Sequence, residues 1–526
     1  MKILLKIILL IFISIHFLNG YKILVVNPKL GYSHVNYFSQ IADILTEVGN
    51  DVTVLSIDLD PLILHPGAFK AKVIKYPASK SVQDAFASLF DSRFLWNLTN
   101  SGIEQYKMVK KYVEATREQA LQVFNDEELS TKLKNENFDL GITETMNTYI
   151  LGMFKVWNIK AYVTGYSMVL SDTYYKDFGL PFPASYIPNM MSPFSDKMTY
   201  LERFQNLLAH HAGEVIMAWH RDRMILQKEF DNKYGVGFFK GKRAIGDSSF
   251  IVINSNPFLD IPGPKTPKMV EVSGIGIQEP KPLNKYWNKV LSLRNQTILI
   301  SFGTFAKSIY MPKDIKKGLL ETVRRFKDIT FIWKYEEPED GTGEGIDNLV
   351  ISKWLPQNDL LNDKRISLFI THGGIGSTTE LSFRGVPAVA IPVLGDQLKN
   401  VKLLERLHTG VVTTKSDLSN PDILEEKIKM VIEDETYRRN AKLVSRRLNK
   451  RPIGSRELLI KHIEFAAEFG RLEILDLASR DMGVIEYYNL DIIIPVMIIF
   501  LSIIVLLLCL LYKLLMRCFS LKIKTD

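Results

Sequence analysis

Three segments in the second half of the chain carry side chains suited to holding a nucleotide. They begin at Trp354, Thr371 and Pro392 of the 526-residue sequence. Trp354 offers a flat face on which a base can stack, and Gln357 offers an amide for hydrogen bonds to the edge of that base. The glycines that follow Thr371 let backbone N–H groups approach a diphosphate without steric hindrance. Together these features predict a nucleotide-binding site.

A bound diphosphate also needs compensation for its negative charge. Ser377 is predicted to begin a helix, whose N-terminal dipole favours anions. His372 can donate a hydrogen bond and stabilise the charge that builds on a leaving phosphate. A second loop of small residues follows a strand predicted to end at Ser301. The residues predicted to hold the diphosphate are Ser301, Gly303, Thr304, His372, Gly373, Gly374, Gly376 and Ser377.

Simpler structural roles exist for several of these residues. Ser377-Thr-Thr-Glu380 fits a capping box, in which Glu380 would only close its own helix. Asp396 fits a helix N-cap, and Trp354 fits a core aromatic residue. However, all of them occur in one order, each at a predicted strand-to-helix junction. We therefore favour the functional interpretation.

The first half of the chain offers a candidate general base. His34 lies at a predicted helix N-terminus, where the positive end of the helix dipole disfavours the imidazolium and helps to keep the ring neutral. Glu144, near the end of an apolar run, is the candidate acid that would orient it. Asp139 is a rival acid, although it precedes the predicted strand. A lone histidine near a loop is more often structural.

The elements expected to position these residues alternate between strands and helices. A strand at 22–26, a helix with Val35, Phe38 and Leu45 on one face, and a strand at 52–55 form a β-α-β unit. Strands in the second half are expected at 297–301, 330–333, 349–351, 368–371 and 388–391, with helices at 314–326, 359–361, 377–384 and from Asn420 to 433. The pattern predicts two doubly wound parallel sheets.

The middle of the sequence, residues 57–245, is less regular. It is rich in aromatic residues and methionine, with long helices expected at 104–124 and 201–230. We expect this region to supply an apolar pocket for a small hydrophobic substrate. The proline- and glycine-rich segment 261–283 is interpreted as the linker between the two halves.

Both ends of the chain indicate membrane targeting. Residues 1–20 resemble a cleavable signal peptide, with a retained signal anchor as the alternative. Ile492 to Tyr512 carries no charge and is long enough to span a bilayer. The basic residues that follow place the tail in the cytosol and the body on the lumenal side. Lys522 and Lys524 resemble a dilysine signal for return to the endoplasmic reticulum.

The overall composition limits the function classes. A net charge of +8 without a long Lys/Arg run does not indicate nucleic acid binding. The two cysteines, Cys509 and Cys518, lie in the span and the tail, so the lumenal part has no disulfide. This argues against a receptor ectodomain built from small modules. Asn97 and Asn295 begin glycosylation sequons, the second just before a predicted strand.

The three nucleotide segments resemble the signature of UDP-glycosyltransferases, the family that contains the animal UDP-glucuronosyltransferases. The likeness extends from the signal peptide to the basic tail. It implies a GT-B fold, in which two Rossmann-like α/β domains face a cleft. It also implies that Glu380 takes the ribose hydroxyls of the donor while Asp396 and Gln397 hold the sugar. Leu30-Gly-Tyr-Ser-His34 resembles the catalytic loop, and Glu144 aligns with the partner acid, which is usually aspartate.

The sequence and the resemblance together predict an inverting transfer of glucuronic acid or glucose from UDP to a small hydrophobic acceptor. The expected order is a signal peptide (1–20), an acceptor-binding domain (21–280), a UDP-sugar-binding domain (281–450), a helical segment (451–490), a transmembrane helix (491–513) and a cytosolic tail (514–526).

Other outcomes stay open at this point. The acceptor could be a membrane lipid such as ceramide, or the chain could be a non-catalytic UDP-sugar-binding partner of another enzyme. Filled catalytic positions argue against the second option. UDP-sugar is expected as a co-substrate, with no cofactor and no metal, because no ligand cluster lies beside the phosphate loop. Homo- or hetero-oligomers are compatible with the sequence.

Overall fold

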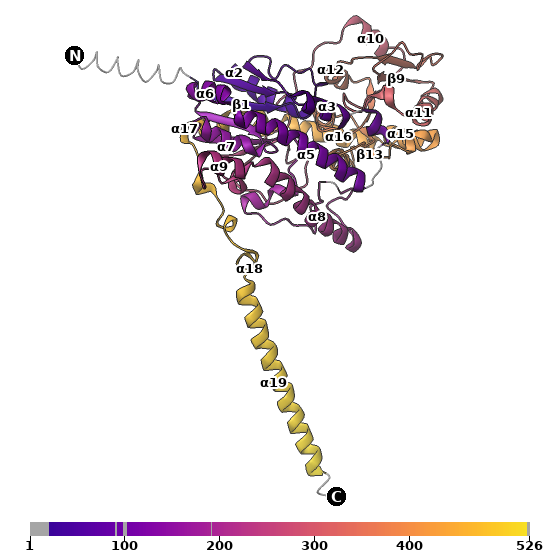
Figure 1. Cartoon of the computed structure of the whole chain (residues 1–526). Helices are drawn as coiled ribbons and strands as arrows, with labels where there is room; N and C mark the ends of the chain where they lie inside the picture. The colour runs from indigo at the N-terminus through magenta and orange to yellow at the C-terminus, as the bar shows by residue number, and fades with distance from the viewer. Residues whose placement is uncertain (1–19, 90–91, 98–101, 191, 523–526) are drawn as a thin grey trace, which may run out of the picture.

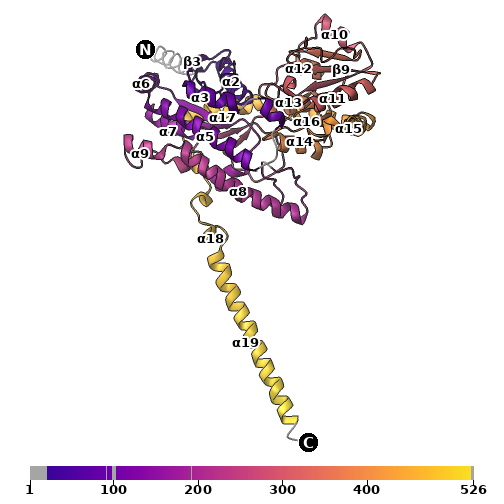
Figure 2. The same ribbon diagram turned by 45° about the vertical axis from the view of Figure 1, so that its right-hand side comes forward.

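The computed structural model describes residues 20–89, 92–97, 102–190 and 192–522, so the predicted signal peptide and the last four residues lie outside the described part. Two parallel β-sheets, each flanked by helices, form two lobes, and one long helix extends away from the body (Figures 1 and 2). All strand pairs are parallel, as expected for doubly wound α/β folds.

The first sheet has the strand order β3-β2-β1-β4-β5-β6-β7. Its strands are β1 (Lys22–Pro28), β2 (Asp51–Ile57), β3 (Lys72–Tyr76), β4 (Leu140–Glu144), β5 (Ala161–Tyr166), β6 (Ile251–Ile253) and β7 (Met269–Glu271). Its core shows the two-residue period of a sheet covered on both faces. Leu24 and Val26 enter one apolar cluster, whereas Ile23 and Val25 enter another on the opposite face.

The helices of this half are α2 (Tyr32–Glu47), α3 (Lys80–Leu89), α4 (Ser92–Asn97), α5 (Gly102–Asn125), α6 (Glu127–Asn135), α7 (Thr148–Val156), α8 (Tyr200–Met224) and α9 (Gln227–Tyr234). The prediction of one helix over 201–230 is wrong, because the chain turns between α8 and α9. Leu226 adopts a left-handed conformation there, with φ of 53°, and its side chain is fully buried. Leu226 and Phe230 both lie in the apolar core despite this turn. The apolar residues therefore recur across the break as they would in one continuous helix.

The second sheet has the order β10-β9-β8-β11-β12-β13. Its strands are β8 (Gln296–Ser301), β9 (Ile329–Lys334), β10 (Leu349–Ser352), β11 (Ile366–Thr371), β12 (Ala388–Ala390) and β13 (Gly410–Val412). Its helices are α10 (Lys285–Leu291), α11 (Lys313–Arg325), α12 (Gln357–Asn362), α13 (Ile375–Arg384), α14 (Gln397–Arg406), α15 (Pro421–Glu433) and α16 (Glu435–Asn449). The predicted cap is present, since the Asn420 side chain accepts a hydrogen bond from the Asp422 N–H.

The segment 261–283 is only partly a linker. Its residues 269–271 form β7, the edge strand of the first sheet, and the connection to the second half follows that strand. Composition alone did not show this strand, because it is three residues long and stands among prolines and glycines.

The two halves also touch through side chains. The Lys399 ammonium on α14 donates to the Leu170 carbonyl at 3.1 Å, and the Trp96 indole on α4 donates to the Lys307 carbonyl at 2.8 Å. Arg406 forms an ion pair with Asp196 at 2.8 Å. These contacts hold the carboxyl ends of the two sheets beside each other.

After α16 the chain returns to the first half. Helix α17 (Ser455–Phe469) packs with Leu459, Ile463 and Ala466 against the apolar face of the first sheet, next to α2 (Figure 2). Short 3-10 turns and α18 (Val484–Tyr487) lead to α19 (Leu490–Lys522). Within residues 490–517 of α19, an 18-residue window has a mean hydropathy of 3.3 and is not buried against the body, so this helix is long and apolar enough to cross a membrane.

Candidate active site at the two sheet switch points

The predicted site residues gather where the strand order of each sheet reverses. In the first sheet this point lies between β1 and β4, and in the second it lies between β8 and β11. Open α/β sheets bind ligands in the crevice beyond the carboxyl ends of such strands. His34 follows β1, Glu144 ends β4, Ser301 ends β8, and His372 follows β11.

The structure brings His34 and Glu144 together. His34 lies in the first turn of α2, and its Nδ1 is 3.0 Å from the Glu144 Oε2. The Glu144 side chain is fully buried, whereas the His34 side chain remains 16% exposed. A carboxylate at this position accepts the Nδ1–H proton, which leaves the Nε2 lone pair as the basic site of the ring.

Ser167 is a third partner that the sequence analysis missed. Its hydroxyl oxygen lies 2.7 Å from the His34 Nδ1, directly after β5 ends at Tyr166. The position at the carboxyl end of a strand adjacent to β4 is the signal that could have identified it. Ser167 and Glu144 together restrict the orientation of the imidazole.

The surroundings of His34 change its basicity in opposite directions. Burial, the largest single effect, lowers its pKa, but the hydrogen bond and charge of Glu144 and the charge of Asp396 outweigh burial. The pKa of His34 is therefore raised above its ordinary value. The net shift is opposite to the one expected from the helix N-terminus alone, because the charges of Glu144 and Asp396 favour the imidazolium.

The two loops predicted to hold the diphosphate, which follow β8 at Ser301 and β11 at Thr371, pack around His372. A Cβ added to Gly303 would lie 2.7 Å from the His372 Cε1, and one added to Gly374 would lie 2.5 Å from its Nε2. Only glycines therefore fit on the two sides of the ring. The His372 Nδ1 is buried and has no hydrogen-bond partner among the described residues. Burial and the charge of Lys334 lower the pKa of His372 to about 4, so the ring is neutral near pH 7.

Lys334 was also missed by the sequence analysis. This last residue of β9 places its ammonium 2.8 Å from the Gly303 carbonyl and 2.8 Å from Glu336. A lysine at the end of a strand next to β8 could have been recognised as a cation beside the phosphate loop. Its ammonium adds a positive charge near the predicted diphosphate site, for which the sequence analysis named only a helix N-terminus and His372.

Helix α13 begins two residues earlier than predicted. Its N-cap is Gly374, so Ser377 and Glu380 both lie inside the helix and no capping box forms. The Gln357 amide instead donates to the Glu380 carboxylate at 2.5 Å and approaches the Ser377 hydroxyl at 3.3 Å. Burial, the largest effect, raises the pKa of Glu380 despite the hydrogen bond from Gln357.

The remaining residues of the donor segments differ in exposure. Trp354 is 67% exposed, so the interpretation as a core aromatic residue is wrong. Apart from its chain neighbours and its own helix backbone, no atom of the described residues lies within 4 Å of a Cβ added to Gly376, so no packing among these residues requires a glycine there. Thr304 is exposed and Gly373 adopts φ of 79°.

Asp396 lies close enough to His34 for each to shift the pKa of the other. It precedes α14 but makes no side-chain cap; its carboxylate accepts a hydrogen bond from the Asn400 amide at 2.8 Å. Burial is the main cause that raises the pKa of Asp396. The Gln397 side-chain oxygen accepts from the Val393 and Leu394 N–H groups at 2.8 and 3.1 Å, so it shapes the loop before α14.

Comparisons with known proteins agree with this arrangement. The family described as UDP-glucoronosyl and UDP-glucosyl transferase matches residues 21–525. A protein of Caenorhabditis briggsae named UDP-glucuronosyltransferase ugt-47 is 28% identical over 91% of this chain and 90% of its own length. UDP-glycosyltransferase UGT5 of Dactylopius coccus is 28% identical over 92% of this chain and 89% of its own length.

Solved structures share the fold at low sequence identity. Spinosyn forosaminyltransferase SpnP aligns with a TM-score of 0.56 at 15% identity, covering 85% of this chain and 99% of that protein. LpCGTa in complex with UDP aligns with a TM-score of 0.53 at 14% identity, covering 85% and 99%. With two parallel α/β sheets of GT-B type and a family match over nearly its whole length, the chain belongs to the UDP-glycosyltransferase family.

Proposed function

We propose that this enzyme transfers glucuronic acid or glucose from its UDP-sugar to a hydroxyl of a small hydrophobic acceptor, with inversion at the anomeric carbon. The observation that carries the proposal is the contact of the His34 Nδ1 with the buried Glu144, which leaves the imidazole Nε2 as the base. A non-catalytic partner subunit would not need such a pair.

In the proposed reaction, the His34 Nε2 takes the proton of the acceptor hydroxyl while its oxygen forms a bond to the anomeric carbon. The bond from that carbon to the phosphate oxygen breaks, and UDP leaves with the electron pair. Glu144 stabilises the imidazolium, which later releases its proton to solvent. Neutral His372 and the N-terminus of α13 stabilise the charge on the departing diphosphate.

The proposed UDP-sugar site is the same whether the acceptor is a diffusible small molecule or a membrane lipid. We propose that the first half, residues 21–280, binds the acceptor and that residues 281–450 bind the UDP-sugar. Trp354 and Gln357 would contact the uracil, Glu380 the ribose, and Asp396 the transferred sugar. The Gln397 oxygen already bonds the neighbouring loop, so its proposed contact with the sugar would use its amide N–H groups.

We also propose that the enzyme is a single-pass protein of the endoplasmic reticulum membrane with lumenal catalytic domains. The long apolar helix near the C-terminus and the basic residues after it support this topology. The predicted signal peptide and dilysine tail lie largely outside the described residues.

The test of function is a panel of UDP-sugars on purified membranes with a phenolic acceptor, in which UDP release is measured. We expect His34→Ala to lower turnover about a hundredfold or more, because a general base is lost, while UDP binding stays nearly intact. Turnover of the variant close to that of the wild type would refute the assignment of His34. Ceramide is tested as a second acceptor in the same assay. UDP release with ceramide but not with the phenol would identify a lipid acceptor.

A further inference from the structure

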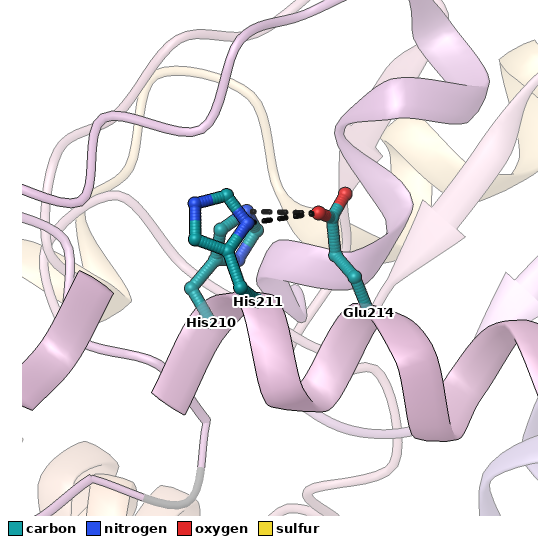
Figure 3. Close-up of side chains that lie close together, drawn as sticks. All are labelled: His210, His211 and Glu214. Atoms are coloured by element: carbon teal, nitrogen blue, oxygen red, sulfur yellow. Dashed lines mark ion pairs between the residues drawn. The ribbon is translucent and has the colours of Figure 1, made fainter. Parts of the chain in front are cut away.

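Three ligand-type side chains converge on helix α8, in the first half of the molecule. His210, His211 and Glu214 lie on consecutive turns of this helix, and Figure 3 shows the Glu214 carboxylate facing both imidazole rings. Their ligand atoms all lie within 4.8 Å of one another. The Glu214 Oε2 is 3.8 Å from the His210 Nε2 and 3.5 Å from the His211 Nδ1.

These separations are long for hydrogen bonds but suit ligands of one metal ion. A good N–H···O hydrogen bond has its heavy atoms about 2.9 Å apart. Two ligands of a tetrahedral zinc ion, each about 2.1 Å from the metal, lie about 3.4 Å apart. The three groups therefore surround a point that an ion could occupy with small side-chain movements.

His210 is already held in the orientation that a metal ligand needs. Its Nδ1 lies 2.7 Å from the Asp172 Oδ2, and the Asp172 side chain is only 1% exposed. Phe182 stacks on the imidazole, with ring centroids 4.0 Å apart. Asp172 accepts the Nδ1–H, so the Nε2 lone pair points toward Glu214. A carboxylate behind a histidine ligand is the usual support of a protein metal site.

We propose that His210, His211 and Glu214 bind a divalent metal ion of zinc type, at a site separate from the UDP-sugar site. Two imidazole nitrogens and one carboxylate are a common zinc ligand set, which leaves a coordination position for water. The prediction that no metal lies beside the diphosphate concerns the other half of the chain. Zinc would connect α8 to the 3-10 helix at 172–174, through Asp172.

The test uses the full chain in detergent, stripped of metal by EDTA and dialysed. Added Co²⁺ should give the visible ligand-field absorption of a tetrahedral site, and Zn²⁺ should displace it and raise the melting temperature. His211→Ala and Glu214→Gln should each weaken binding strongly. His211 is 64% exposed and Glu214 is 38% exposed, so both variants should fold as the wild type does without metal.

Two further variants sharpen the result. Asp172→Asn should weaken binding about ten- to a hundredfold, because the support of His210 is lost. His408→Asn is the matched control: it removes an exposed histidine of the second half, and asparagine tolerates the left-handed backbone at that position. Absence of Co²⁺ absorption in the wild type, or absorption that persists in both His211→Ala and Glu214→Gln, would overturn the proposal.

Discussion

Two carboxylates set the basicity of the proposed catalytic histidine. The pKa of His34 is raised because the hydrogen bond and charge of Glu144, with the charge of Asp396, exceed the effect of burial. A general base must be neutral to accept a proton, so activity should fall as the pH falls through this raised pKa. The acidic limb of kcat/KM is therefore expected above pH ~6.5, the ordinary value for histidine.

Replacing Glu144 by glutamine should move that limb. Glu144→Gln removes the charge that raises the pKa of His34 while the burial that lowers it remains. We expect the acidic limb of kcat/KM to shift to lower pH and the plateau of turnover to fall strongly. The donor KM should change little, since Glu144 lies in the first half of the chain and is proposed to act on His34. A pH–rate profile of UDP release measures both effects.

Two variants serve as controls for Glu144. Glu144→Asp keeps the charge on an arm one methylene shorter, so it should retain much more activity than Glu144→Gln. Asp139, the rival acid, accepts a hydrogen bond from the Lys22 N–H at 2.8 Å at the start of β1, a structural role. Asp139→Asn should therefore remain active. An inactive Asp139→Asn beside fully active Glu144 variants would show that the acid is misassigned.

At the scale of elements, the start of α13 depends on close contacts around His372. Gly374→Ala would place a Cβ 2.5 Å from the His372 Nε2 and must displace the ring. We expect UDP affinity to fall about ten- to a hundredfold, as for the loss of a hydrogen bond to a charged group. Isothermal titration with UDP measures this.

Gly376→Ala is the matched comparison on the same helix. Beyond its chain neighbours and its own helix backbone, no atom in the described part of the chain lies within 4 Å of its added Cβ, so the melting temperature should not fall. UDP affinity should still fall, because the methyl group would enter the space proposed for the diphosphate. An unchanged affinity would contradict the placement of Gly376 against the donor.

The same elements would support the proposed diphosphate without a metal ion. The N-terminus of α13, His372 and Lys334 all lie at the phosphate loop. Sugar transfer is therefore expected to survive EDTA, even though chelation would empty a zinc site on α8. The measurement is UDP release with and without chelator below the melting temperature. A large loss of activity that magnesium or manganese restores would show that a cation assists the departure of UDP.

The sequence predicted most elements with strong periodicity, and the reasons for the exceptions are local. The strands at 297–301 and 368–371 are confirmed within two residues. Both α13 and the break at Leu226 were misjudged, because a glycine N-cap and a left-handed leucine leave no distinct pattern in the sequence.

The candidate site likewise contains residues that no local sequence pattern identifies. His34 and Glu144 could be named from a motif, whereas Ser167 and Lys334 could not. These two residues lie near the site only because β5 pairs with β4 and β9 pairs with β8. Strand order is a long-range property, and a single sequence contains no local record of it.

At the scale of the whole molecule, the segment that leads to the long apolar helix α19 is bonded to the first half. The chain after α17 bonds that half through the Ser479 hydroxyl, which donates to the Gly179 carbonyl at 2.6 Å, and through the Arg480–Asp247 ion pair at 2.9 Å. Figure 2 shows α19 leaving the body beneath the lobe that contains α8 and α9. In the proposed topology, the half proposed to bind the acceptor is therefore the one nearest the membrane.

The orientation across the membrane can be tested by proteolysis of sealed microsomes that contain the chain with a C-terminal epitope tag. The apolar part of α19 is followed by Lys513, Arg517 and further basic residues, which favour the cytosolic side. Added protease should remove the tag and the segment after Tyr512, while the body stays protected because the membrane encloses it. Detergent should make the body accessible, which controls for intrinsic resistance of the fold. Digestion of the body in sealed vesicles, with the tag protected, would reverse the proposed topology and place the UDP-sugar site in the cytosol.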